Sequence, residues 1–116
     1  MNAVRVTQCL SGIGVGSSVA VADSWWRRLR GLLARPPLRT GEGILLMGCN
    51  SVHTAGMSYA IDVAFLDAEG VVVRSIHELA PWRIGLGGSR AVHALELPAG
   101  RLDATDTVPG VRLIWS

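Results

Sequence analysis

Lysine is absent from this chain of 116 residues, and charged side chains of all kinds make up only 17% of it. All eleven basic side chains are therefore arginines, and they exceed the nine acids to give a formal net charge of +2. Apart from a cluster at Arg27, Arg28 and Arg30, the arginines are spread along the chain. Proteins that bind the nucleic-acid backbone usually concentrate basic residues on one face. The composition therefore argues against a nucleic-acid partner.

Cysteine is scarce, and long hydrophobic runs are missing. Cys9 and Cys49 are the two cysteines, and they show no CxxC spacing. Reduced thiols are the simplest expectation, with a single bridge between them as the alternative. No charged leader with an apolar core and no run of about twenty apolar residues occurs, so neither an export signal nor a transmembrane segment is expected. We expect a cytoplasmic protein; the alternative is an exported protein whose leader was removed before the numbering begins.

Apolar residues, in contrast, supply 49% of the chain, which is enough for one core in a single domain over 1–116. In WWRRLRGLLAR they recur every three or four positions, which predicts a helix over 25–35 that ends at Pro36 and Pro37. A brief helical piece is expected over 102–107. Short apolar runs predict strands over 4–10, 19–22, 44–47, 61–67, 71–79, 91–97 and 111–115.

The strands 61–67 and 71–79 are separated by Asp-Ala-Glu-Gly, which predicts a hairpin turn. The whole pattern indicates a β-rich α+β fold. We expect one compact antiparallel barrel- or sandwich-like sheet domain, covered by one helix in the N-terminal half. Parallel winding is not expected, because the chain has too few helices to supply crossovers between parallel strands.

Cys49, His53 and Asp62 bring a thiol, a base and an acid into one neighbourhood of the sequence. These residue types could serve as nucleophile, general base and orienting acid in a small hydrolase-like enzyme. Their spacing does not bring the three side chains within hydrogen-bonding reach, and free cysteines commonly pack in the core. Core packing is therefore the preferred interpretation of Cys49, and catalysis is the alternative.

Metal binding would have to use His53, His77, His93, Cys49 and Asp62. No pair among these residues has a recognised metal-binding spacing. His77 and His93 fall in separate predicted strands, where a surface position or a satisfied core position is the simpler interpretation. We therefore expect no metal and no other cofactor.

The segment from Ser51 to Asp67, SVHTAGMSYAIDVAFLD, places polar groups beside a strongly apolar strand. Such a combination suits a binding pocket, because pockets mix an apolar lining with a few orienting polar groups. The alternative is that these residues pack and cap turns without binding anything. The residues predicted to line the pocket are His53, Thr54, Met57, Asp62, Trp82 and Arg83.

Six motifs follow one another along the chain: RGLLAR, GEGILL, SVHTAGM, IDVAFLD, PWR and ALELPAG. This succession resembles the domain-of-unknown-function 192 family, with a family-like core over about 23–115. The resemblance implies a compact, mostly β fold and no established reaction. Members are often exported, which implies a role accessory to an envelope or secretion process.

Two segments depart from the family pattern. Residues 55–56 and 58–60 replace the aromatic and proline-bearing residues that are usual around the methionine, which would alter a pocket wall. Residues 109–111, Pro-Gly-Val, stand where members commonly have Gly-Asp. Our hypothesis is a non-catalytic module that binds a small molecule or a protein. Its rival is the hydrolase-like enzyme that uses Cys49, His53 and Asp62.

Overall fold

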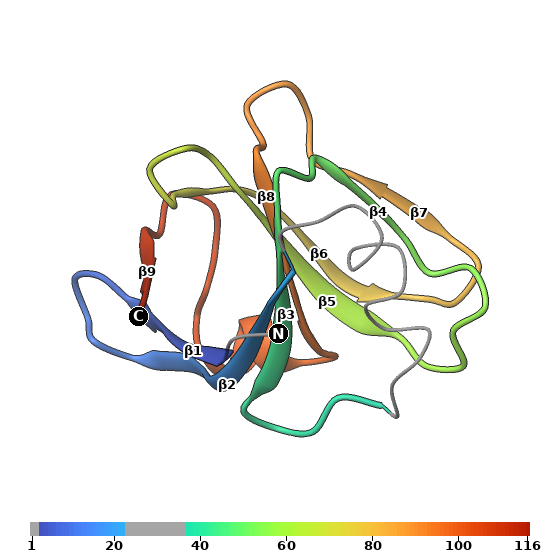
Figure 1. Ribbon diagram of the computed structural model, residues 1–116, viewed down its shortest axis with the longest axis horizontal. Coiled ribbons are helices and arrows are strands. Elements are labelled where there is room, and N and C mark those ends of the chain that lie inside the picture. Colours follow the sequence, from blue (N-terminus) through green and yellow to red (C-terminus); the bar gives the residue numbers. More distant parts are fainter. Residues whose placement is uncertain (1–2, 23–36) are drawn as a thin grey trace.

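The computed structural model describes residues 3–22 and 37–116 of the chain (Figure 1). Its strands and short helix are β1 (Ala3–Gln8), β2 (Gly14–Ala22), β3 (Glu42–Met47), β4 (Ser51–His53), β5 (Ile61–Leu66), β6 (Val72–Leu79), β7 (Ile84–Leu86), β8 (His93–Pro98), α2 (Arg101–Ala104) and β9 (Leu113–Trp115). No helix in these two ranges is long and apolar enough to cross a membrane. The helix predicted over 25–35 lies outside the described residues.

Seven strands form one sheet in the order β6-β5-β8-β3-β2-β1-β9, and β4 pairs separately with β7. Within the large sheet β2 and β3 run parallel, whereas the other neighbours run antiparallel. The predicted antiparallel barrel- or sandwich-like sheet is therefore wrong, whereas the covering N-terminal-half helix of that prediction falls outside the described residues. The error has a physical source: a shortage of helices excludes a wholly parallel sheet, but one crossover is enough to make a mixed sheet.

The sheet is also not closed into a barrel over the residues described. Its edge strands, β6 and β9, approach each other at one isolated bridge between Val71 and Arg112. Beside it the Val72 amide donates to the Val111 carbonyl at 2.8 Å. A closed barrel needs a continuous ladder between its first and last strands, and these few bonds only fasten one corner.

The hairpin predicted over 61–67 and 71–79 is confirmed, with β5 antiparallel to β6. Its turn is held by the Asp67 carboxylate, which accepts hydrogen bonds from the Glu69 and Val71 amides at 2.9 Å each. Gly70 has a φ of 83°, a left-handed conformation that glycine adopts without steric cost. A side chain there would also meet the Leu113 carbonyl oxygen at 2.6 Å from its Cβ.

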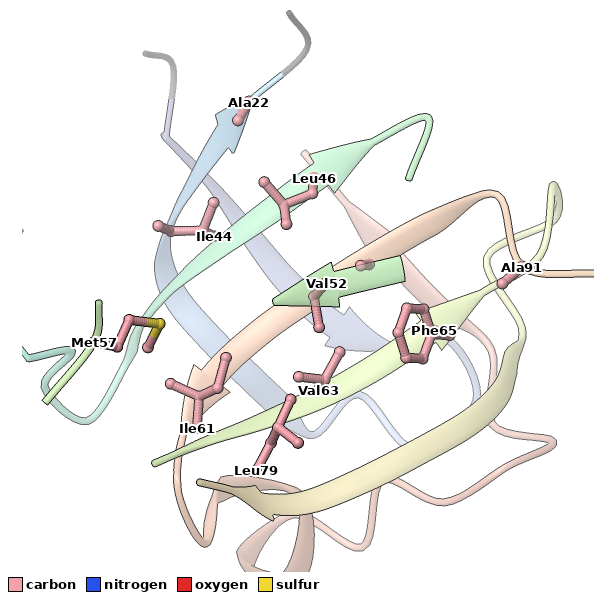
Figure 2. Close-up of a cluster of buried hydrophobic side chains, with 11 residues drawn as sticks. Ala22, Ile44, Leu46, Val52, Met57, Ile61, Val63, Phe65, Leu79 and Ala91 are labelled. Carbon is pink, nitrogen blue, oxygen red and sulfur yellow. The ribbon is translucent and has the colours of Figure 1, made fainter. Parts of the chain in front are cut away.

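The large sheet is buried on both faces at its centre, and β5 contributes to both. Its six residues are all buried. Ile61, Val63 and Phe65 join the hydrophobic cluster shown in Figure 2, whereas Ala64 and Leu66 join a second cluster. Successive side chains of a strand point to opposite faces. A continuous apolar run such as β5 therefore indicates a central strand, covered on both sides.

The β4–β7 pair packs over the first cluster and lies at the opposite end of the molecule from β1 and β9 (Figure 1). Val52 of β4 is part of that cluster. Gly85 of β7 is buried, and a Cβ at this position would lie 2.8 Å from Ile76 Cδ1 and 3.3 Å from Leu79 Cδ2. Glycine therefore lets β7 approach β6 closely.

The last strand brings the C-terminal end beside the first strand. β9 pairs with β1 in antiparallel register. The Arg5 amide donates to the Ser116 carbonyl at 3.0 Å, and the Ser116 amide donates back to the Arg5 carbonyl at 3.1 Å. These reciprocal bonds hold residue 116 to the sheet.

Candidate functional site

The β4–β7 pair buries one face and exposes the other. Val52 and Gly85, which lie opposite each other, face inward. The residues before and after each of them in its own strand are exposed. Ile84 has 72% of its surface exposed, and Leu86 has 59%. Large apolar side chains that are this exposed indicate an interaction site when they form one patch. Five of the exposed residues of this pair and of the turn before β7 are here called the Trp82 surface: His53, Trp82, Arg83, Ile84 and Leu86.

Thr54 is the buried residue that ties this surface together. Its hydroxyl donates to the Ala80 carbonyl at 2.6 Å and accepts a bond from the Arg83 amide at 2.9 Å. Its main-chain carbonyl accepts from the Trp82 amide at 3.0 Å, and its amide donates to the Arg83 carbonyl at 2.9 Å. One threonine thus fixes the backbone on both sides of Trp82, as hydroxyl groups commonly do in turns.

Trp82 itself combines strain with exposure. Its φ is 61°, in the left-handed region that bulky residues rarely occupy. Its side chain is 69% exposed, so core packing does not account for the large ring. Backbone strain persists only where the surroundings impose it, and it is often found at binding and catalytic sites. The bonds from Thr54 are the surroundings that impose it here.

The segments around the β4–β7 pair also share one sign of charge. No aspartate or glutamate occurs in 43–61 or in 79–95. The second segment contains Arg83 and Arg90, both exposed. The acid nearest to Arg83 along the chain is Glu78, which is exposed on β6. Arginine is thus in slight excess here, and opposite charges at an interface speed association and raise specificity.

The residues predicted to line a pocket fall into three groups. His53, Trp82 and Arg83 are exposed near one another, and the buried Thr54 joins β4 to the turn that carries Trp82. Met57 is buried in the first cluster, where Figure 2 shows its thioether toward Ile61. Asp62 lies elsewhere.

Asp62 is fully buried within β5, between Ile61 and Val63 of the first cluster, so its side chain points to the other face of the sheet. Its two carboxylate oxygens accept bonds from the Glu78 and Leu102 amides, each at 2.9 Å. The first bond supports Glu78 at a φ of 52°. The second anchors the start of α2. Asp62 thus cross-links the backbone.

This placement bears on the hydrolase-like alternative. Cys49 packs, partly buried, against the first cluster, and His53 is exposed on β4. Asp62 points to the opposite face of the sheet and uses both oxygens for main-chain amides. A catalytic triad needs nucleophile, base and orienting acid in hydrogen-bonding sequence. The three residues do not have that arrangement.

The other two histidines have local roles. His77 Nδ1 lies 3.6 Å from Asp103 Oδ1 at the surface. His93 Nδ1 accepts a bond from the Gly48 amide at 3.1 Å, and its ring meets Trp115 edge-on at 6.1 Å between centroids. Burial lowers the pKa of His93. No group of three metal-ligating side chains occurs in ranges 3–22 and 37–116, and the expectation of no metal stays a prediction.

Glu96 is a residue that sequence reasoning missed. It lies on β8 opposite Ile44 of β3 and Val63 of β5, both fully buried, and is itself only 5% exposed. Desolvation raises the pKa of its carboxyl to about 8. The alternation of 91–97 suggests one apolar face and one solvated face, with Glu96 on the latter. The signal that would have found it is the apolar composition of both neighbouring strands, which makes β8 a central strand.

A shallow hollow lies far from the Trp82 surface, between the β5–β6 turn and β9. Its lining residues are Ala68, Glu69, Gly70, Arg112, Leu113, Ile114 and Trp115. Arg112 Nε donates to the Glu69 carbonyl at 3.0 Å, and the other lining residues are mostly apolar. Binding sites usually converge several free polar groups on an apolar cavity, and the hollow lacks that convergence.

Comparison with known sequences supports the resemblance given by the motifs. The family model DUF192, described as "Uncharacterized ACR", matches residues 8–115. A UPF0127 protein of Pyrococcus horikoshii is 33% identical over 100 residues, which are 84% of this chain and 86% of that protein. One of Thermococcus sibiricus is 30% identical over 101 residues. That match covers 84% of this chain and 65% of its relative, so the chain spans less than two thirds of the Thermococcus protein.

Two solved structures share the fold. A Sinorhizobium meliloti protein, named as a candidate transcription regulator, has a TM-score of 0.83 at 23% identity, with 97% of this chain and 91% of that chain covered. A Novosphingobium aromaticivorans protein of unknown function has a TM-score of 0.79 at 18% identity, with 97% and 84% covered. At such identities the likeness concerns the fold alone.

Proposed function

The chain belongs to the DUF192 family of uncharacterised proteins, and we propose that it is a non-catalytic protein-interaction module that binds through the Trp82 surface. The observation that carries the proposal is the display of Trp82. A tryptophan that is 69% exposed and held at a φ of 61° is retained at a cost to stability. A partner that covers the ring supplies the reason.

Three apolar side chains make this surface adequate for specific binding. Trp82, Ile84 and Leu86 are all more than half exposed. Full burial of a completely exposed Ile or Leu side chain is worth about 1.5–3 kcal/mol, and a partner gains the share that is still exposed here. Tryptophan is enriched among the few residues that dominate binding energy at interfaces. A partner that covered all three would gain enough to bind specifically after the entropy cost of association is met.

The surface is rigid, which supports binding through it. Thr54 holds the turn with side-chain and main-chain bonds, and Gly85 seats β7 on Ile76 and Leu79. A backbone that is already fixed loses little conformational entropy when a partner arrives. Of the six residues predicted to line a pocket, this proposal uses His53, Trp82 and Arg83 as contacts and Thr54 as their support.

The test uses defined ligands. Peptides are selected from a random phage-displayed library on the wild-type chain, and synthetic copies are titrated calorimetrically into wild type, Trp82→Ala and Ile114→Ala. Ile114 is a matched control, because it is a large apolar residue, 46% exposed, on the distant strand β9. We expect Trp82→Ala to weaken binding at least about tenfold and Ile114→Ala to leave it within about twofold. Undiminished binding by Trp82→Ala would overturn the proposal.

A further inference from the structure

The edge of β7 opposite β4 carries main-chain groups that point away from β4. The Thr54 amide donates to the Arg83 carbonyl at 2.9 Å, and the Gly87 amide donates to the Asn50 carbonyl at 2.8 Å. In an antiparallel pair, residues that bond to the partner strand alternate with residues that do not. The main-chain amides and carbonyls of Arg83, Gly85 and Gly87 point toward β4. Those of Ile84 and Leu86 therefore point away from β4.

No main-chain hydrogen bond from residues 3–22 or 37–116 is recorded to this outward edge of Ile84 and Leu86. Exposed edges usually carry protection against pairing, such as proline, an edge lysine or a bulge. The strand Ile84–Leu86 has none of these, and its pairing with β4 is in regular register. At three residues the strand is short, which itself limits pairing, but outward main-chain groups beside two exposed apolar side chains can still pair with another strand.

We propose that β7 accepts an extended peptide of a partner protein as the third strand of the β4–β7 sheet, and that this peptide is apolar at its centre and acidic at its flanks. The inference rests on the proposed function, because it names the binding mode of the same surface. Apolar side chains of the peptide lie beside Ile84 and Leu86. The peptide main chain bonds to the outward amides and carbonyls of these two residues.

The acidic flanks follow from charge. Arg83 directly precedes β7, and Arg90 follows it by four residues. Both are exposed, and the segment 79–95 that contains them has no acid. In the sequence, an arginine therefore flanks each end of β7. Carboxylates at the peptide termini complement these charges. The arginines also disfavour pairing of β7 with β7 of a second copy, because that pairing would bring like charges together.

The test titrates a capped peptide, Asp-Asp-Val-Thr-Val-Thr-Asp-Asp, into the full chain and follows amide signals by NMR. Two further peptides each carry one N-methyl group, either on an amide that faces β7 or on the next amide, which faces away. Only the first removes a donor to β7. We expect it to weaken binding about tenfold or more and the second to leave affinity within about threefold. Bound peptide should also slow hydrogen exchange of the Ile84 and Leu86 amides.

The outcomes separate this inference from the proposed function. Equal effects of both N-methyl groups, with binding still lost in Trp82→Ala, would overturn strand addition and leave the Trp82 surface intact. Failure of the library-selected peptides to depend on Trp82 would overturn both. Binding to vesicles of anionic phospholipid but to neither designed nor selected peptides would also overturn both. A concentration-dependent dimer joined through β7, seen by analytical ultracentrifugation with the designed peptide unbound, would overturn the peptide as occupant.

A charge test uses Arg83→Ser and Arg90→Ser together. We expect this double variant to bind the acidic peptide more weakly and to lose most of the salt dependence that wild type shows between low and high sodium chloride. Arg5→Ser is the control, because Arg5 is exposed on β1 at the distant end. Salt dependence that persists unchanged in the double variant would overturn the acidic character of the partner.

Discussion

The central strands of the large sheet and the β4–β7 pair contain similar apolar residues, which are buried in the first and exposed in the second. In β5 and β8 apolar side chains are buried on both faces, as in Phe65 and Leu95, each with no exposed surface. In β7 the side chains of Ile84 and Leu86 are mostly exposed, and only glycine faces the core. The contrast teaches that the hydrophobicity of a strand alone does not show whether its side chains are buried. Burial depends on whether other elements cover one face of the strand or both.

The two regions should therefore respond differently to substitution. Changes in the central strands should alter the free energy of unfolding, because those side chains are buried and closely packed. Changes on the Trp82 surface should alter binding and leave stability nearly untouched, because exposed side chains lose little on truncation. The predictions below test this division, beginning with the largest effect.

Glu96→Gln should change the pH dependence of stability most. With a pKa of about 8 in the folded state against an ordinary 4.5, the carboxyl stays protonated in the fold while the unfolded chain ionises. The free energy of unfolding therefore falls as pH rises from 4.5 to 8, by an order of 5 kcal/mol in total. Urea denaturation across this range should show the fall in wild type and not in the variant. Glu69→Gln, at an exposed turn, should behave as wild type.

Phe65→Ala should destabilise by about 4 kcal/mol, since it empties a fully buried position in the cluster of Figure 2. Urea denaturation at fixed pH measures the loss, and Phe65→Leu should lose less than half as much. Retention of wild-type stability by Phe65→Ala would contradict the central position of β5.

Thr54→Val tests the support between the two regions. It removes the hydroxyl that bonds to the Ala80 carbonyl and the Arg83 amide, so two part-buried hydrogen bonds are lost. We expect a loss of about 1–3 kcal/mol in stability. Binding of library-selected peptides should weaken as well, because the backbone around Trp82 loses its constraint. Thr54→Ser, which keeps the hydroxyl, should recover both properties; failure of Thr54→Ser to do so would mean that the methyl group matters.

Trp82→Asn should have the smallest effect on stability and a complete effect on binding. Asparagine tolerates a φ of 61° better than tryptophan does. The free energy of unfolding should therefore stay the same or rise by up to about 1 kcal/mol as the strain is relieved, while peptide binding is lost. A large loss of stability would show that the exposed ring supports the fold, and the contrast between the two regions would fail.

Local patterns made much of the fold predictable. The β5–β6 hairpin follows from two apolar runs around a turn whose aspartate and glycine have clear roles. The parallel pairing of β2 with β3 and the pairing of β4 with β7 join residues far apart in sequence. Neither pairing leaves a periodic signal, because partner choice depends on the whole sheet.

The site was also predictable only in part, because local sequence shows residue types and does not show which of them come together. His53, Trp82 and Arg83 stand out as polar and aromatic residues beside prolines and glycines. Asp62 is equally conspicuous in the sequence. Because side chains alternate along a strand, however, it points to the opposite face of the sheet, where its carboxylate accepts hydrogen bonds from main-chain amides. Exposure of Ile84 and Leu86 depends on the packing of Gly85 against β6 and was invisible in the sequence.

The reciprocal bonds between Arg5 and Ser116 determine how the molecule is presented when it is attached to something else. They hold the C-terminal residue beside β1, at the opposite end from β7 (Figure 1). A tether, fusion partner or sensor surface joined after Ser116 would therefore leave the Trp82 surface directed outward. Immobilisation through this end is the geometry in which binding measurements should meet the least steric hindrance.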